Sequence, residues 1–145
     1  MDFDRSVRRW SNTCFMVTAI MVAFWAAWFG HRSLVASSTT DVYIGFENAF
    51  PAPDAWLTLC LIGAGISLRR RRPIALLWLL LSAGAGGYLF AIDVAFDVEH
   101  GIWASGAGGL IELGINLLTL TLTVAIIRWA WRNRLELQGL KQLDG

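Results

Sequence analysis

Cysteine and histidine are scarce in this sequence, and their scarcity argues against several kinds of site. The chain has two cysteines, Cys14 and Cys60, which lie in different apolar runs and form no CxxC motif. This excludes a zinc ribbon and argues against a thiol oxidoreductase, so we expect both cysteines to be small buried hydrophobic residues. The two histidines, His31 and His100, are far apart, and no Glu-x-x-His motif is present. A haem held by this pair is disfavoured, because bundle cofactors are bound by side chains inside the helices, and we expect no cofactor.

A strong excess of one charge is also lacking. The chain has 12 basic and 11 acidic residues, for a formal net charge of +1. The basic residues are grouped at the ends of apolar runs rather than spread over a soluble surface, so no nucleic-acid partner is expected. The arginine run at 69–72 could bind anionic lipid. Between two apolar runs so close together, we expect it to act as a topology signal instead.

Apolar residues are abundant. They make up 56% of the 145 residues, above the roughly 45–50% of a soluble domain, and the mean hydropathy is +0.53. Long apolar runs predict membrane-spanning helices at about 12–30, 52–68, 73–95 and 106–127. We therefore expect residues 1–145 to form one all-α domain, an integral membrane four-helix bundle embedded in the lipid bilayer.

The positions of the arginines predict the orientation of this bundle. Basic residues occur before the first span, at 69–72 and after Ile127, and Arg32 is the only one elsewhere. By the positive-inside rule, both termini and the 69–72 loop are expected in the cytoplasm. The connection at residues 31–53 then lies on the outer side.

This first outer connection is expected to hold an amphipathic segment. The run Ser37-Ser38-Thr39-Thr40-Asp41 is a helix-start signal. Apolar residues after it recur with a helical period, opposite Glu47 and Asn48, which predicts a short helix on or in the outer leaflet. Asp54 follows two prolines and is placed to cap the next helix.

Acidic side chains gather on the predicted outer side: Asp41, Glu47, Asp54, Asp93, Asp97, Glu99 and Glu112. Asp93, Asp97 and His100 share one helix face, because they are spaced i, i+4 and i+7. Asp93 and Glu112 are expected deepest, at similar depth on antiparallel helices, with Asn116 one turn beyond Glu112. Two such carboxylates repel each other, so at least one is expected to hold a proton at neutral pH.

Several kinds of chemistry remain open for this outer pocket. One is a divalent metal site, since facing helices can combine oxygen and imidazole ligands; its ligands would be Asp93, Asp97, His100 and Glu112. Another is a pocket for a small or sterol-like molecule, lined by Glu47, Trp56, Asp93, Glu112 and Asn116. Four-helix isomerase folds pair acids with tryptophan in a similar way, an analogy of architecture only. A structural alternative is that these groups bond one another and hold the outer loops to the bundle.

The segment Glu47-Asn48-Ala49-Phe50-Pro51, followed by Asp54, Trp56, the arginine turn and Asp93, resembles an uncharacterised family of small bacterial four-span inner-membrane proteins. The resemblance covers residues 43 to about 116, and E-N-A-F-P-x-x-D-x-W is its most specific part. It implies a multi-pass protein of the bacterial inner (cytoplasmic) membrane and no particular activity.

The leading hypothesis is therefore a binding or accessory protein with an outward-facing acidic pocket. Its guest would be a cation, a polar lipid or other small molecule, or a partner subunit in the membrane. The candidate ligand-binding residues are Glu47, Asn48, Asp54, Trp56, Asp93, Asp97, Glu112 and Asn116. The competing hypothesis is a small membrane enzyme or proton-coupled transporter in which Asp93 and Glu112 form an acid/base or proton-carrying pair.

Overall fold

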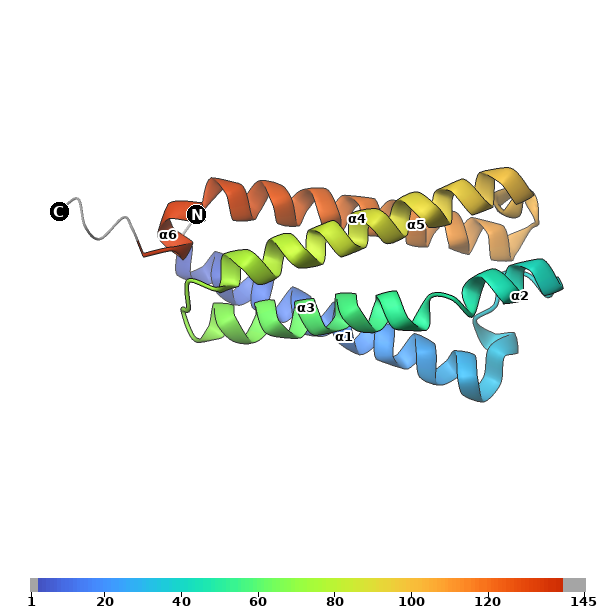
Figure 1. The fold of residues 1–145 in the computed structure, drawn as a ribbon, viewed down its shortest axis with the longest axis horizontal. Coiled ribbons are helices and arrows are strands. Elements are labelled where there is room, and N and C mark those ends of the chain that lie inside the picture. The colour runs from blue at the N-terminus through green and yellow to red at the C-terminus, as the bar shows by residue number, and fades with distance from the viewer. Residues whose placement is uncertain (1–2, 140–145) are drawn as a thin grey trace.

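A computed structural model describes residues 3–139, and every regular element in that range is a helix (Figure 1). The long helices are α1 (Phe3–His31), α3 (Pro51–Arg69), α4 (Ala75–His100) and α5 (Ala107–Arg132). The shorter ones are α2 (Asp41–Glu47), α6 (Arg134–Leu137) and two 3-10 helices, Arg32–Leu34 and Ile102–Ala104. The predicted all-α class is confirmed.

Four segments are long and apolar enough to cross a membrane, as the sequence predicts. They are Phe3–Leu34, Asp41–Arg69, Ala75–His100 and Ala107–Arg132. The helices extend beyond the predicted spans because a helix continues into polar residues at its ends, whereas those spans were bounded by apolar content alone. The lengths and compositions are those of a multi-pass membrane protein.

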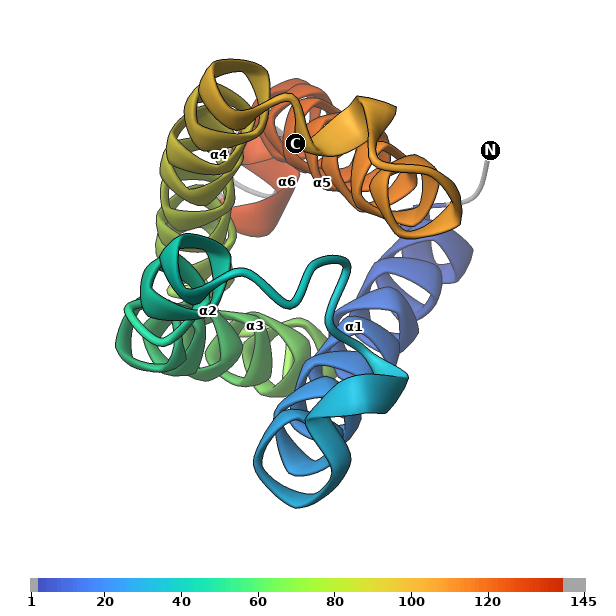
Figure 2. The same ribbon diagram turned by 90° about the vertical axis from the view of Figure 1, so that its right-hand side faces the viewer.

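The long helices stand side by side in a ring (Figure 2). Helix α1 packs against α3, α3 against α4, and α4 against α5, so each pairs with the long helix next to it in the chain. Helix α1 begins and α5 ends at one end of the bundle, the terminal end, while α2 lies at the opposite end, the α2 end (Figure 1).

The fourth side of the ring, which we call the α1–α5 seam, is joined near the terminal end. There Trp129 Nε1 donates a hydrogen bond to Ser6 Oγ at 2.7 Å. The Trp129 ring also lies against Trp10, with centroids 5.6 Å apart. Elsewhere α1 and α5 approach each other less extensively than the other three neighbouring pairs do.

Local sequence signals fix several helix ends. Thr40 caps α2, as the polar 37–41 run predicts, because its Oγ1 accepts a hydrogen bond from the Tyr43 backbone N at 3.3 Å. Gly101 ends α4 in the left-handed conformation, with φ of 63°. The prediction that Asp54 caps α3 is wrong: α3 starts at Pro51, and no side chain caps its first turn. The Asp54 carboxylate is therefore available to another partner.

Small residues bring the helices together towards the terminal end. Ser11 Oγ on α1 donates to the Gly65 carbonyl oxygen on α3 at 2.9 Å, and both residues are buried. Arg69 Nε donates in turn to Ser11 Oγ at 3.1 Å. Cys14 and Cys60 are buried free thiols, which confirms their expected role as small packing residues.

Gly63→Ala is expected to destabilise the protein, although alanine normally favours a helix. A Cβ at position 63 would lie 2.6 Å from the Trp78 ring of α4. We expect a loss of about 1–3 kcal/mol, the usual cost of overpacking. Gly84→Ala is the matched control, because nothing lies within 4 Å of its Cβ position, and it should be neutral or stabilising by up to about 1 kcal/mol. Thermal unfolding of both variants measures this, and equal melting temperatures would contradict the close α3–α4 approach.

Candidate binding site

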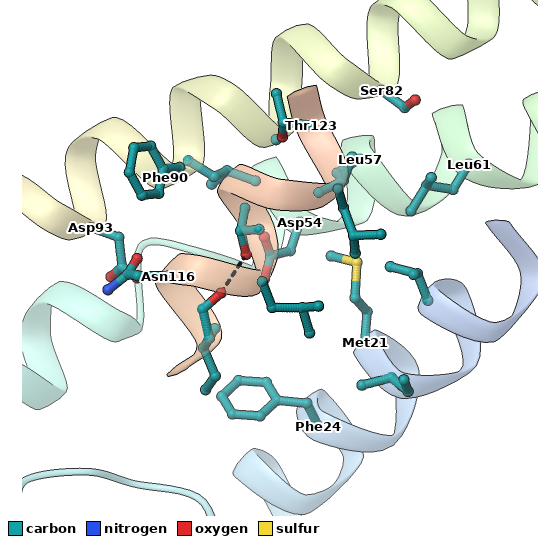
Figure 3. A pocket seen from close by; sticks show the side chains of 18 of the residues that line it. Met21, Phe24, Asp54, Leu57, Leu61, Ser82, Phe90, Asp93, Asn116 and Thr123 are labelled. Atoms are coloured by element: carbon teal, nitrogen blue, oxygen red, sulfur yellow. Dashed lines mark hydrogen bonds between the residues drawn. The ribbon is translucent and has the colours of Figure 1, made fainter. Parts of the chain in front are cut away.

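A cavity lies inside the ring and has a volume of about 280 Å³. This is near the lower limit of pockets that hold small ligands, roughly 300–1,000 Å³. Its walls come from α1, α2, α3, α4 and α5 and are mostly apolar. Figure 3 shows Met21, Phe24, Leu57 and Phe90 among the side chains that border this space. The acidic residues of the cavity are confined to its α2 end.

Three carboxylates meet at this α2 end. Glu47 of α2, Asp93 of α4 and Glu112 of α5 each offer one oxygen, and these oxygens lie within 4.8 Å of one another. Glu47 and Glu112 are buried, and Asp93 is half-buried. We call these residues the carboxylate trio. Because like charges at this distance repel, the trio favours a bound cation or shared protons.

Glu112 is held by the connection between α1 and α2. Ser37 Oγ donates a hydrogen bond to Glu112 Oε2 at 2.5 Å, and the Tyr43 hydroxyl donates to the same oxygen at 3.4 Å. The connection can reach α5 because Gly108 has no side chain: a Cβ there would lie 2.6 Å from the Ser37 carbonyl oxygen. This connection therefore covers the α2 end of the cavity.

Glu47 differs from Asp54 and Glu112, both of which accept hydrogen bonds. Its side chain is 7% exposed and borders the cavity, and no group in the described part of the chain donates a hydrogen bond to it. Burial of a carboxylate without a donor or a positive partner is unfavourable. No group within residues 3–139 offsets this cost.

Aromatic packing fixes helix α2, and with it Glu47. The Phe46 ring stacks on Phe96 of α4, with centroids 3.8 Å apart and planes at 4°. On the other side, Tyr43 packs against Trp28 of α1, and both are almost fully buried, at 2% and 1% exposed. Because α2 is anchored to both α1 and α4, Glu47 is held towards the cavity.

Asp54 and Asp97 have partners of their own. Trp25 Nε1 donates to Asp54 Oδ2 at 2.9 Å, so Asp54 joins α3 to α1 while still bordering the cavity. Asp97 is 1% exposed and accepts two hydrogen bonds, from Trp103 Nε1 at 2.8 Å and from Asn116 Nδ2 at 2.7 Å. Asp97 does not border the cavity but orients Asn116, which lies beside Asp93 (Figure 3).

The candidate metal ligands from the sequence do not all come together. The structure brings Asp93 and Glu112 to one point, where Glu47 joins them. Asp97 is directed to Trp103 and Asn116 instead. His100 is exposed, with its ring stacked on Phe96 at 4.1 Å and Nδ1 3.0 Å from the Phe96 carbonyl oxygen.

The candidate ligand-binding residues divide in the same way. Those that line the cavity are Glu47, Asp54, Asp93, Glu112 and Asn116. Asn48 is exposed and accepts a hydrogen bond from Trp28 Nε1 at 3.2 Å. Trp56 is 49% exposed and borders no part of the cavity.

Several residues of the site were not expected from the sequence. Ser37 and Tyr43 hold Glu112, and Trp25 holds Asp54. The helical period of the apolar residues after Thr40 includes Tyr43, and this predicts that Tyr43 faces inward. Nothing in the sequence singles out Ser37 from its neighbours in a polar connection, because its role depends on where α5 lies.

In comparisons with known proteins, no family model, no curated protein and no solved structure matches the chain.

Proposed function

We propose that the protein is a membrane binding protein whose cavity holds the positively charged group of a small molecule at the carboxylate trio. The observation that carries this proposal is Glu47: it is almost fully buried, borders the cavity and receives no hydrogen bond from the described chain. A guest with a positive, hydrogen-donating head would offset the cost of burying this carboxylate and the repulsion from Asp93 and Glu112.

An organic cation fits the cavity better than a metal ion alone. The trio offers oxygen ligands of the type that Mg²⁺, Ca²⁺ or Mn²⁺ prefer. However, the cavity continues from the trio along apolar walls that include Met21, Leu57 and Leu61. A bare ion makes no favourable contact with apolar walls, whereas an organic molecule would be in contact with them along its length.

The proposed location is a bacterial inner membrane, with the α2 end of the cavity on the outer side. Arginines at the N-terminus, at 69–72 and after Ile127 support this orientation through the positive-inside rule. The resemblance of residues 43 to about 116 to small four-span inner-membrane proteins supports the same location. The acidic trio would then lie in the outer half of the bundle.

Proton-coupled transport of the same guest is a second candidate function. It is favoured by the proximity of the Asp93 and Glu112 oxygens to each other and to Glu47 within 4.8 Å. A proton and a cation could compete for these carboxylates, as in exporters that use a membrane acid. Uptake into vesicles with an imposed pH gradient, compared with protein-free vesicles, separates the two functions. A transporter adds gradient-dependent uptake to the passive entry of the neutral amine, whereas a binding protein does not.

The test of the proposed function is a thermal-shift titration of the purified full chain with methylamine, octylamine, Mg²⁺ and Mn²⁺. We expect an amine to raise the melting temperature of the wild type, because a ligand that binds only the folded state stabilises it. Asp93→Asn should remove most of this shift. Glu99→Gln, an exposed acid on the same helix, is the matched control and should leave it unchanged.

Two outcomes would contradict the proposal. One is an equal amine response in Asp93→Asn and Glu99→Gln, since that would place the amine away from the trio. The other is a larger shift with Mg²⁺ or Mn²⁺ that Asp93→Asn abolishes, since that would make the trio a metal site.

A further inference from the structure

Among the described residues, the exposed part of the cavity wall lies on one side of the ring. Its largely exposed lining residues are Ile20, Ile115 and Leu118, at 58%, 42% and 57% exposed. All three belong to α1 or α5, whereas the lining residues from α2, α3 and α4 are buried or half-buried. The opening therefore lies on the α1–α5 seam.

This opening is surrounded by apolar side chains at the middle of two candidate spans. Ile20 lies within Phe3–Leu34, and Ile115 and Leu118 lie within Ala107–Arg132, both apolar enough to cross a membrane. In a bilayer, such positions meet hydrocarbon rather than water. A molecule that reaches the opening must therefore be one that dissolves in the membrane.

The α2 end, where water would be nearest, is covered. Figure 2 shows the connection after α1 crossing this end of the ring. Its Ser37 is held to Glu112 by a hydrogen bond of 2.5 Å and lies directly over Gly108. The carboxylate trio is therefore more accessible along the cavity from the seam than from the end of the bundle.

We infer that the guest is a single-chain amphiphile with a positively charged amine head, which moves from the bilayer into the cavity through the α1–α5 seam. This inference rests on the proposed function and names the class of molecule. The head would lie at the carboxylate trio, and the alkyl chain along the apolar walls. The cavity volume of about 280 Å³ lies near the lower limit of ligand pockets, roughly 300–1,000 Å³, which favours a guest with one alkyl chain over a guest with two.

The experiment uses the full chain in lipid nanodiscs, with octylamine, 1-octanol and methylamine as probes. Isothermal titration calorimetry gives the affinities, and stopped-flow fluorescence gives the association rates. Leu118→Trp narrows the opening with a larger side chain. Leu117→Trp is its matched control, because Leu117 is 56% exposed on the same helix but does not border the cavity. The association rate of octylamine should fall about tenfold or more in Leu118→Trp, because its opening is narrower, and stay within about twofold of the wild type in Leu117→Trp.

A further variant separates a blocked opening from a damaged fold. Leu118→Ala leaves the opening at least as wide as in the wild type, so octylamine should not associate more slowly with it than with the wild type. In the wild type, the affinity for octylamine should be at least about ten times the affinity for methylamine, because only octylamine has an alkyl chain long enough to pack against the apolar walls. Octylamine should exceed 1-octanol by a similar factor, because only the amine is attracted by the trio.

Each alternative result has a distinct meaning. If methylamine binds as tightly as octylamine and both tryptophan variants behave like the wild type, the bilayer route is overturned while the amine site at the trio stands. If 1-octanol binds as tightly as octylamine, the amine head is overturned. If neither amine binds the wild type, this inference and the proposed function fail together.

Discussion

Glu47→Gln should raise the thermal stability of the ligand-free protein and, at the same time, abolish its binding of amines. Glu47 is buried beside Asp93 and Glu112, with no donor from the described chain. Glutamine has nearly the same shape but no charge, so the repulsion disappears. We expect a gain of about 0.5–2 kcal/mol, the range typical of relieving an unfavourable functional site, measured as an increase in melting temperature without ligand.

The pH dependence of this gain follows from the same repulsion. An ionised carboxylate that is unfavourable in the folded state costs stability as the pH rises, so the wild type should lose stability towards neutral pH more than Glu47→Gln does. In acid, where the wild-type carboxyl group is neutral, the two proteins should melt at similar temperatures. Glu99→Gln, at an exposed position, is the control and should follow the wild type at every pH.

A purely structural role for Glu47 predicts the opposite result. If the carboxylate held α2 to the bundle, its replacement would lower the melting temperature. A Glu47→Gln protein that is less stable than the wild type and still responds to amines would therefore remove Glu47 from the binding site. Increased stability together with loss of the amine response is the combination that a binding carboxylate predicts.

Asp97→Ala should cause the largest loss of stability among the acidic positions. Asp97 is 1% exposed and accepts hydrogen bonds from Trp103 and Asn116 at 2.8 and 2.7 Å. Hydrogen bonds to a charged group contribute about 1.5–3 kcal/mol each, so the loss of both should cost about 3–6 kcal/mol. Because Asn116 would lose the group that orients it beside Asp93, amine binding should weaken as well.

Two further variants check this prediction. Glu99→Ala removes an exposed carboxylate two residues away and should change the melting temperature little. Asp97→Asn keeps one acceptor oxygen and should lose less stability than Asp97→Ala. If Asp97→Ala and Glu99→Ala melt at the same temperature, the two hydrogen bonds do not hold the α4–α5 pair together.

The sequence was sufficient for those features that depend on local signals. Long apolar runs predicted the four candidate spans, and the polar run before Asp41 predicted the start of α2. Gly101 ends α4 in the left-handed conformation that glycine adopts readily at helix ends. Each of these features depends on residues close together in the chain, whose preferences do not require knowledge of the tertiary fold.

The partners of the acidic residues could not be predicted in the same way. Asp93 and Asp97 lie one turn apart on α4, yet Asp93 borders the cavity and Asp97 turns to Trp103 and Asn116. In a soluble helix, the pattern of polar and apolar residues shows which face is buried. A membrane helix is apolar on most sides, so the rotation of α4 against α5 depends on packing and on single polar contacts.

The position of Glu47 shows the same limit at longer range. Its place in the trio requires α2 to lie against α4, which depends on the stacking of Phe46 on Phe96. These residues are far apart in the chain, and the stacking of two aromatic rings produces no periodic pattern in the sequence that could predict it. The acidic end of the cavity was therefore predicted as a region, whereas its geometry was not.

Because the cavity is exposed at the α1–α5 seam, the lipid or detergent around the protein affects any measurement of ligand affinity. A molecule in the cavity has protein on three sides, and on the fourth it meets whatever surrounds Ile20 and Leu118. In micelles that neighbour is a detergent, itself a head group on one alkyl chain, which has the shape expected of the guest. An affinity measured in detergent is therefore the outcome of a competition, and a detergent with a cationic head should compete more strongly than one with a neutral sugar head.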